Sequence, residues 1–361
     1  MTTRIRGDSF DKLLEGLAER RPAAVARALT MVEDHRPGFE RLLAALHPKL
    51  GRARRLGRTG PPGAGKSTLT TELARSMRAA GHTVAILAVD PTSPFTGGAL
   101  LGDRIRMESV ALDPGIFIRS LATRGSLGGL SGAIREAADV LDGAGFDVIL
   151  IETVGVGQSE LDVARVADSI VVVLVPESGD AIQTLKAGLM EIADLYVVNK
   201  SDRPGADRLR TDIEVMLGIR GAAAYRNIPA HHGVDLKRIM NPARAAREAA
   251  RDDQADSWTP PVIKAVASKG EGVDDLVSAL DRHTDYLGRS GELHRRRRLR
   301  LRERVVDAVE RRLRDRLWGD ADTRVWLDER LPDLEAGKIT PFALADELLA
   351  RSGDLLTRTA R

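Results

Sequence analysis

The sequence predicts an α/β fold in which a mostly parallel β-sheet is covered by helices on both faces. Between residues 52 and 287, near-continuous apolar segments of strand length alternate with amphipathic segments of helix length. This alternation is typical of a parallel sheet that is buried on both sides. A glycine-rich stretch, residues 60–68, also matches the phosphate-loop pattern GxxxxGK[ST] at every fixed position. Because ligands of such sheets bind beyond the carboxyl ends of the strands, we expect the functional residues to follow the strands directly.

The composition is that of a globular protein. The chain has 361 residues, of which 43% are hydrophobic and 30% are charged. No apolar run reaches the ~18 residues of a membrane span, and residues 1–12 lack the apolar region of a secretion signal. Cysteine is absent, which excludes disulfides and thiolate metal sites and fits a reducing compartment. The net charge of +3 is small and disfavours nucleic acid binding. We therefore expect a cytoplasmic protein with no nucleic acid and no membrane partner.

Residues 1–50 are predicted to form a helical segment ahead of the α/β domain, which we place at residues 51–290. Apolar side chains recur at spacings of three and four over two stretches that Arg20, Arg21 and Pro22 separate. The positions that carry this pattern are Phe10, Leu13, Leu14 and Leu17, then Val25, Ala28, Leu29 and Val32.

The glycine-rich stretch predicts a P-loop nucleotide site. Its glycines let successive backbone N–H groups turn toward phosphate oxygens, and the helix that follows points its positive dipole end at the anion. Lys66 is expected to reach the β- and γ-phosphates and Ser67 to ligate Mg²⁺. The helical pattern after the loop ends at Gly81, which distinguishes the stretch from an ordinary glycine-rich turn. The predicted nucleotide-binding residues of this loop are Gly60, Gly63, Ala64, Gly65, Lys66, Ser67 and Thr68.

The strand that feeds the loop, Arg54–Thr59, lacks the apolar β-branched residues of a typical central strand. Burying Arg58 without a partner would cost several kcal/mol, so we expect it to reach the sheet edge or to meet an acidic group.

The other strands are predicted more clearly by their apolar sequences. Apolar segments predict strands at Thr83–Val89, Gly115–Ile118, Asp147–Ile151, Ser169–Val175, Leu195–Val198 and Val262–Val266. The clearest helices between them are Leu130–Leu141, Ala181–Ala193 and Val273–Leu287.

Carboxylates follow two of these strands. Asp90 and Asp103 lie on a hydroxyl-rich stretch that suits a switch sensing Mg²⁺ and the γ-phosphate; a turn at Asp90 and a helix N-cap at Asp103 are the alternative.

Glu152 ends a strand three residues before Gly155, an arrangement that holds a Mg²⁺-bound water while the glycine N–H meets the γ-phosphate. Lys66, Glu152 and Gly155 are thus the predicted catalytic residues, and Ser67, Asp90, Asp103 and Glu152 the predicted metal ligands. Val156 stands where a water-orienting glutamine would be, which predicts slow intrinsic hydrolysis.

The pattern NKxD follows the strand that ends at residue 198 and predicts guanine recognition. A carboxylate at Asp202 accepts hydrogen bonds from guanine N1–H and from the N2 amino group, which adenine does not offer. Asn199 would brace the loop, and the stem of Lys200 would lie along the base. Ser268 and Lys269, after the last strand, would supply a backbone N–H to guanine O6. These residues predict a G domain that binds GTP and GDP rather than ATP.

A resemblance to a known family is carried by Val89–Gly98, Phe117–Ser120, Thr123–Gly125, Glu152–Glu160 and Lys186–Glu191. With these residues, the sequence resembles the MeaB/ArgK/MMAA family of G proteins over nearly its whole length. The resemblance implies that GTP hydrolysis is coupled to loading, protecting or repairing adenosylcobalamin on methylmalonyl-CoA mutase or a related acyl-CoA mutase. It also implies a homodimer joined through a C-terminal helical extension.

The resemblance further implies a mobile segment that relays the nucleotide state to the mutase. The matching stretch starts at Pro176, and its candidate partner-switch residues are Glu177, Asp180, Gln183 and Lys186. A strand-to-helix turn capped by Asp180 is a compatible local structure for the same stretch.

Two further regions depart from the α/β pattern. Residues 218–258 are predicted to be an ordered surface insertion; its adjacent His231 and His232 have no nearby ligand of suitable spacing for a metal site. Residues 291–361 are predicted to be a helical dimerisation arm. It opens with an arginine run, and apolar residues then recur at steps of four from Val305 to Leu317. Trp318, Trp326, Leu327, Leu331 and Leu334 are expected to extend its apolar surface.

Two alternative functions share this architecture. A nickel-delivery G protein is disfavoured because such proteins use cysteine-containing metal sites and this chain has no cysteine. A transport ATPase or kinase of the ArgK type is disfavoured by the guanine-reading NKxD pattern.

Overall fold

The computed structural model describes residues 7–91, 107–123, 129–153, 163–176, 191–220 and 258–353. The chain divides into two compact units, Met1–Arg297 and Arg298–Arg361. Within the described ranges, no helix is long and apolar enough to cross a membrane.

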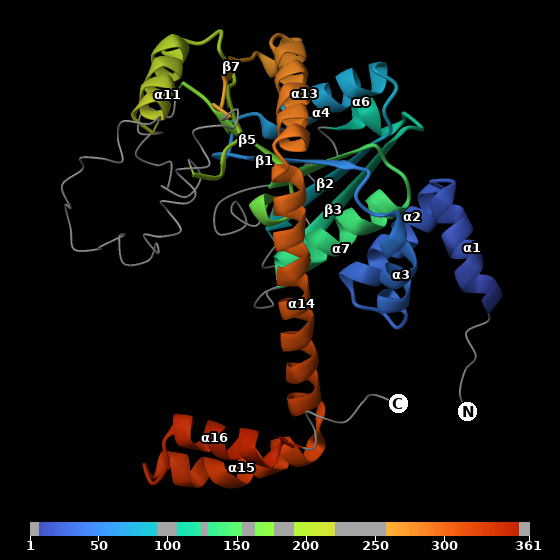
Figure 1. Ribbon diagram of the computed structural model, residues 1–361, viewed down its shortest axis with the longest axis vertical. Helices are drawn as coiled ribbons and strands as arrows, with labels where there is room; N and C mark the ends of the chain where they lie inside the picture. The colour runs from blue at the N-terminus through green and yellow to red at the C-terminus, as the bar shows by residue number, and fades with distance from the viewer. Residues whose placement is uncertain are drawn as a thin grey trace. The chain divides into compact units, whose positions relative to one another are not determined.

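The first unit contains a seven-stranded sheet of order β3-β2-β4-β1-β5-β6-β7 (Figure 1). Every neighbouring pair of strands is parallel, which confirms the predicted α/β fold. Four strands keep the near-continuous burial that the apolar segments predicted. The strands are β1 (Arg54–Thr59), β2 (Val84–Pro91), β3 (Ile116–Thr123), β4 (Val148–Thr153), β5 (Ser169–Leu174), β6 (Leu195–Val198) and β7 (Val262–Lys264).

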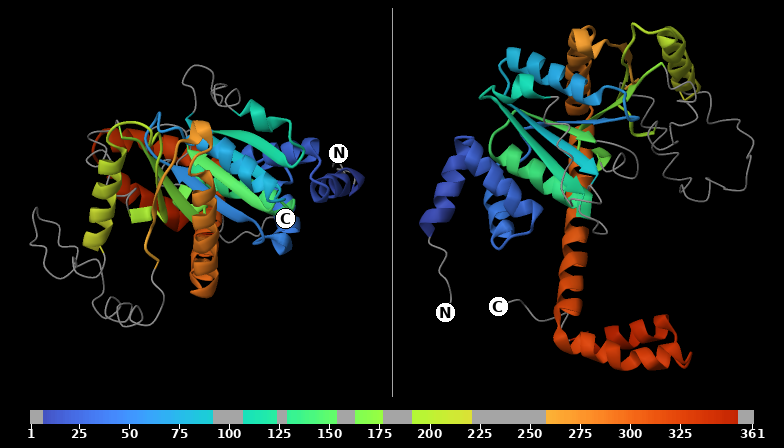
Figure 2. Two further views of the ribbon diagram at one scale, coloured as in Figure 1. Left: turned by 90° about the horizontal axis from the view of Figure 1, so that it is seen from above. Right: turned by 180° about the vertical axis from the view of Figure 1, so that it is seen from behind.

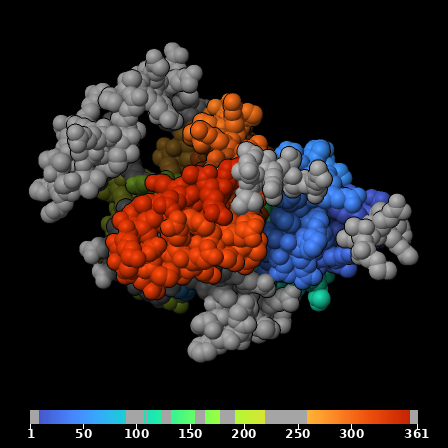
Figure 3. Space-filling view, turned by 90° about the horizontal axis from the view of Figure 1, so that it is seen from below, coloured from blue at the N-terminus to red at the C-terminus, as the bar shows by residue number. Residues whose placement is uncertain are grey.

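One face of the sheet is covered by the N-terminal helices together with α7, in a single apolar core. The right-hand view of Figure 2 shows these helices on one side of the strands, and Figure 3 shows the surface of the N-terminal helices in blue. Asp142 of α7 fixes the link to β1 by accepting hydrogen bonds from the backbone of residues 51–53. The elements on this face are α1 (Gly7–Ala18), α2 (Pro22–Glu33), α3 (Phe39–Leu46), η1 (His47–Lys49), α7 (Gly129–Gly143) and η2 (Val163–Arg165).

The opposite face packs against helices that follow the phosphate loop and the last strand, in a second apolar core. Near the β7 edge of the sheet, α11 (Ala206–Arg220) buries its apolar side on β5 and β6 in a third cluster. The elements of the second core are α4 (Lys66–Ala79), α6 (Glu108–Ala111), η5 (Ala267–Lys269) and α13 (Val273–Arg289).

Strand β1 lies at the centre of the sheet although its sequence is polar. Arg54 Nη1 donates to Asp281 Oδ1 at 2.7 Å, and Arg55 Nη2 donates to Asp139 at 2.8 Å. Gly57 leaves room for η2, because a Cβ there would collide with Val163. Arg58 is fully buried, and among the described residues nothing accepts a hydrogen bond from its guanidinium. The expectation that Arg58 reaches the sheet edge is wrong, since β1 has a strand on each side.

Two predicted features fall largely outside the described residues. They are the helix expected over residues 181–193 and the insertion expected over residues 218–258, with its two adjacent histidines.

The second unit is helical. Its small core contains Trp326, Leu344 and Leu348. Trp326, which was expected to extend the apolar surface of the arm, packs inside this core and is 9% exposed. Helices α15 and α16 begin at N-caps, where Asp320 accepts from Thr323 N at 2.8 Å and Thr340 accepts from Ala343 N at 3.2 Å. The helices are the later part of α14 (Glu292–Gly319), α15 (Ala321–Glu335) and α16 (Pro341–Arg351).

Candidate nucleotide site

The phosphate loop occupies the turn between β1 and α4, as the sequence predicted. Gly60 and Gly65 both have positive φ angles, 142° and 82°. A Cβ at Gly60 would collide with the carbonyl oxygen of Val173, and a Cβ at Gly65 would collide with the side chain of Asn199. Both positions therefore require glycine, for conformation and for space.

Lys66, the first residue of α4, is buried and lies against the backbone of its own loop. Its Nζ donates to the carbonyl oxygens of Gly60 at 2.8 Å and of Pro61 at 3.1 Å. The ammonium is thereby held at the loop, beside the N-terminus of a helix whose dipole also favours an anion. Thr68, two residues farther along α4, is exposed.

Ser67 and Glu152 meet at the loop although 85 residues separate them in the chain. Ser67 Oγ donates to Glu152 Oε1 at 2.6 Å, and Thr70 Oγ1 contacts the other carboxylate oxygen. Glu152 is 1% exposed. The predicted metal ligands Ser67 and Glu152 are thus brought together, and they offer the hard oxygen donors that Mg²⁺ prefers.

Asn199 connects the end of β6 to two other loops. Its Nδ2 donates to Ala64 O of the phosphate loop at 2.8 Å, and its Oδ1 accepts from Ala267 N of η5 at 3.0 Å. Asn199 is 3% exposed, so both hydrogen bonds are shielded from water and hold the three loops in one arrangement.

The predicted base-reading residues lie at the ends of β6 and β7. Lys269 Nζ is 3.7 Å from Asp202 Oδ2, and both side chains are about half exposed. Ser268 is also exposed. Lys200 has a positive φ of 55°, which turns the chain sharply between Asn199 and Asp202. The structure therefore brings Asp202 and Lys269 together at an open edge of the loops that Asn199 connects.

Several predicted site residues cannot be placed in the same way. Asp90 belongs to β2 and pairs with Ala122 of β3, and its side chain lies outside the description. In the described part of the chain, no cluster of three or more His, Cys, Asp and Glu side chains could hold a metal ion. The predicted residues that lie outside the described ranges are Asp103, Gly155, Glu177, Asp180, Gln183 and Lys186.

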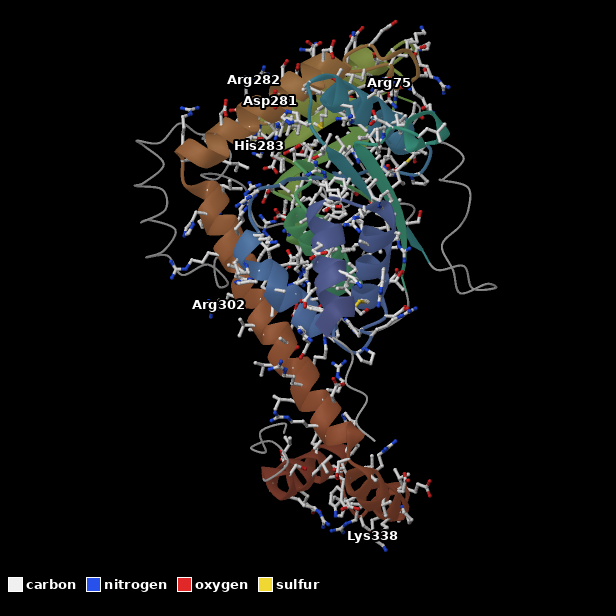
Figure 4. All side chains as sticks on the ribbon, turned by 90° about the vertical axis from the view of Figure 1, so that its right-hand side faces the viewer. Arg75, Asp281, Arg282, His283, Arg302 and Lys338 are labelled. Atoms are coloured by element: carbon white, nitrogen blue, oxygen red, sulfur yellow. The ribbon has the colours of Figure 1, made fainter. Side chains whose placement is uncertain are left out.

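A buried polar network at the opposite end of β6 was not predicted. Asp194, 5% exposed, accepts from Arg296 Nη2 at 2.9 Å and Nη1 at 3.0 Å, and its Oδ1 lies 3.3 Å from His283 Nε2. His283, labelled on α13 in Figure 4, places Nδ1 2.8 Å from Ser169 Oγ. Burial alone would raise the pKa of Asp194, but the interactions with His283 and Arg296 outweigh it and lower that pKa.

The neighbouring arginine extends this network. Arg297 donates to both oxygens of Asp168, at 3.2 and 2.7 Å, and to the carbonyl oxygen of Ala53 at 3.0 Å. The arginine run thus has a role that its sequence did not indicate: its second and third arginines fasten the start of α14 to the amino ends of β5 and β6.

Comparison with known proteins places the chain in one family. The family model of the methylmalonyl-CoA mutase-associated GTPase MeaB matches residues 25–322. A Pyrococcus abyssi protein is 40% identical over 340 residues, covering 94% of this chain and 96% of its own length. The mitochondrial methylmalonic aciduria type A homolog of Mus musculus is 32% identical over 357 residues, covering 94% of this chain and 78% of its own.

A solved structure extends the comparison to three dimensions. The structure described as a LAO/AO transport system kinase has a TM-score of 0.63 and 26% sequence identity, and it covers 96% of this chain and 99% of that one. The chain is therefore a member of the MeaB family of methylmalonyl-CoA mutase-associated GTPases.

Proposed function

We propose that this GTPase is a chaperone of an acyl-CoA mutase of the methylmalonyl-CoA mutase type. In this proposal, GTP binding and hydrolysis gate the loading, protection or repair of adenosylcobalamin, which is held by the mutase and not by this chain. The family description, which names a mutase-associated GTPase, supports the choice of partner. The observation that carries the nucleotide part of the proposal is Asn199, which joins the phosphate loop to the loops that carry Asp202 and Lys269.

The proposed nucleotide is GTP or GDP with Mg²⁺. Lys66 and the amides of residues 60–68 would bind the phosphates, and Asp202 and Ser268 would read the base. Ser67 and Glu152, 2.6 Å apart, fit a magnesium site, with Asp90 and Asp103 proposed as further contributors. When bound, the metal would neutralise charge on the β- and γ-phosphate oxygens.

We further propose that intrinsic hydrolysis is slow and that the partner accelerates it. The support is Val156, an apolar residue directly after Gly155 in the sequence, which cannot hydrogen-bond an attacking water. Single-turnover hydrolysis, with and without the mutase, tests this idea. A basal rate already in the tens per second would contradict it.

The proposed link to the mutase is the stretch that contains Glu177, Asp180, Gln183 and Lys186. It follows β5 directly in the chain, and the carbonyl oxygen of Val173, in that same strand, lies against Gly60 of the phosphate loop. Replacing Lys186 by Ala should weaken the mutase's acceleration of hydrolysis while leaving GDP affinity intact. A variant that responds to the mutase as the wild type does would exclude this residue from the link.

We propose a homodimer formed through the second unit. Its core is small, and α14 has no buried residue. Val305 and Val309, one turn apart, are 65% and 50% exposed, which is unusual for an apolar helix stripe without a partner. A second copy would cover this stripe.

The dimer is tested by light scattering on size-exclusion fractions. The double change Val305→Asp and Val309→Asp should yield a monomer that still binds GDP. The matched control is Arg314→Asp, which shifts the net charge by the same amount at an exposed position of the same helix. Dimerisation of the double variant at wild-type strength would overturn the proposal.

A kinase of the LAO/AO transport type is the second candidate. The solved structure that matches nearly the whole chain carries that description. An ATP-dependent kinase assay on purified protein tests it, and calorimetry with ADP and GDP gives an independent answer. Preference for ADP would favour the kinase.

The decisive experiment for the mutase is a pull-down with the protein held in GDP or in a non-hydrolysable GTP analogue. Cobalamin transfer to the captured mutase should depend on which nucleotide is bound. Recovery of no acyl-CoA mutase in either state would contradict the chaperone proposal.

A further inference from the structure

Arg58 stands directly behind the phosphate loop, on the same side of the sheet as Glu152. It is two residues before Gly60, and β1 pairs it in register with Glu152 of β4 and Val171 of β5. Residues in register on parallel strands point to the same face. Glu152 reaches α4 on that face through Ser67, so Arg58 shares the side of the sheet that carries the metal-binding oxygens.

The surroundings give the Arg58 charge no evident structural use. The side chain is 0% exposed, and among the described residues no atom accepts a hydrogen bond from its Nε, Nη1 or Nη2. Leu56 and Val171, on the same face, belong to the apolar core. An apolar side chain would fit such a place better, because burying an unbonded guanidinium is unfavourable.

Glu152 is the carboxylate that acts on this charge. Burial lowers the pKa of Arg58 to about 10, and the attraction of Glu152 opposes that shift. An arginine guanidinium keeps its positive charge at neutral pH. The Glu152 carboxylate also accepts hydrogen bonds from the hydroxyls of Ser67 and Thr70 of α4.

Glu152 is thus the in-register neighbour of a buried cation and also accepts a hydrogen bond from Ser67, the other proposed magnesium ligand. A positive charge near a metal site repels the metal and attracts the nucleotide phosphates, and low exposure keeps water and salt from screening either effect. Binding of nucleotide and of metal are reciprocally linked, so a charge that favours one and opposes the other changes their coupling.

We propose that Arg58 is a fixed counter-charge of Glu152 that weakens Mg²⁺ binding and makes guanine nucleotide binding less dependent on the metal. This inference rests on the proposed function, because it assumes that Ser67 and Glu152 hold Mg²⁺ beside GDP or GTP. In this proposal Arg58 acts through Glu152 as a positioning residue and does not touch the nucleotide.

The test is the affinity for a fluorescent GDP analogue, measured against free Mg²⁺ concentration for the full chain. In Arg58→Met, the Mg²⁺ concentration at half effect should fall about tenfold, and binding in excess EDTA should weaken. Arg58→Lys, which keeps the charge, should behave like the wild type. Arg54→Met removes a charge from the same face of β1, at its far end beside Asp281, and should also leave the Mg²⁺ dependence unchanged.

The outcomes distinguish a failure of the proposed function from a failure of the role proposed for Arg58. A wild-type protein that binds no guanine nucleotide at any Mg²⁺ concentration would overturn the proposed function itself. A wild-type protein that binds GDP, with the same Mg²⁺ midpoint in Arg58→Met, would overturn only the role of Arg58. Equal shifts in Arg58→Lys and Arg58→Met would also overturn it, because packing and not charge would then be responsible.

Discussion

Asn199 ties the carboxyl end of β6 to the phosphate loop, because its Nδ2 donates a hydrogen bond to the carbonyl oxygen of Ala64 at 2.8 Å. The same side chain holds η5 through Ala267 N. Gly65 makes this approach possible, since any Cβ there would occupy the position of the Asn199 amide. The geometry of the candidate site therefore depends on one buried amide that contacts two segments lying far apart in the sequence.

Replacing Asn199 by Ala should weaken GDP binding more than tenfold and destabilise the fold by about 2 kcal/mol, because two buried partners lose their hydrogen bonds. Calorimetry and urea unfolding measure the two effects. Asn199→Asp is the informative companion, since it keeps the acceptor for Ala267 N but places a second acceptor against Ala64 O. GDP affinity equal to the wild type in both variants would contradict the bracing role.

Replacing Asp202 by Asn should move the preference from guanine toward xanthine nucleotides. In the proposed base recognition, the carboxylate would accept from two guanine donors, whereas the amide of Asn can donate to the additional carbonyl of xanthine. Competition between GDP and XDP measures the change. Asp202 is half exposed, and its ion pair with Lys269 is loose, at 3.7 Å. The variant should therefore unfold at the wild-type temperature, so a loss of GDP binding cannot be ascribed to misfolding.

Replacing Asp194 by Asn should destabilise the protein by about 2 kcal/mol at pH 7, because Arg296 loses a two-point ion pair that is mostly shielded from solvent. The pKa of Asp194 is lowered in the folded protein, so its contribution is fully present above its ordinary pKa of 3.8 and is lost as the pH falls through the lowered value. The difference between wild type and variant should thus stay constant from pH 7 to about 5 and shrink in stronger acid.

Urea unfolding at several pH values measures this difference. Asp281→Asn is the matched control, because Asp281 also pairs with an arginine but is half exposed, and its loss should cost less than about 0.5 kcal/mol. A difference for Asp194→Asn that grows in acid would contradict the ion-pair assignment.

Local sequence patterns predicted the parts of the fold that depend on apolar period and on glycine. Strands β4, β5 and β6 are almost purely apolar and lie where they were expected. The pairing of Ser67 with Glu152 followed from topology, because both stand at the carboxyl edge of neighbouring strands in a parallel sheet.

Long-range ion pairs could not be predicted in the same way. Arg296 and Asp194 are 102 residues apart, and nothing in the arginine run indicates that its second and third members would bind carboxylates at the amino ends of β5 and β6. His283 likewise occupies an ordinary core position of an amphipathic helix. The polar strand β1 illustrates the same limit, since its arginines are acceptable in a central strand only because Asp139, Asp142 and Asp281 come from distant helices.

Arg58 is the exception among these arginines, and its replacement by Ile should raise the melting temperature by several degrees. Burial lowers its pKa to about 10 although Glu152 opposes the shift, so the folded state disfavours the charged form relative to the unfolded chain. That penalty is fully present below pH 10 and is relieved only as the guanidinium loses its proton at higher pH. The gain in Arg58→Ile, about 2 kcal/mol, should therefore be the same at pH 6 and at pH 8.

Differential scanning calorimetry at both pH values measures this gain in stability, with Arg55→Ile as the contrast. Arg55 pairs with Asp139 and Asp142, so its loss leaves buried carboxylates without their cation and should lower the melting temperature. If Arg58→Ile also lowered it, Arg58 would have a partner whose loss outweighs the relief of burial.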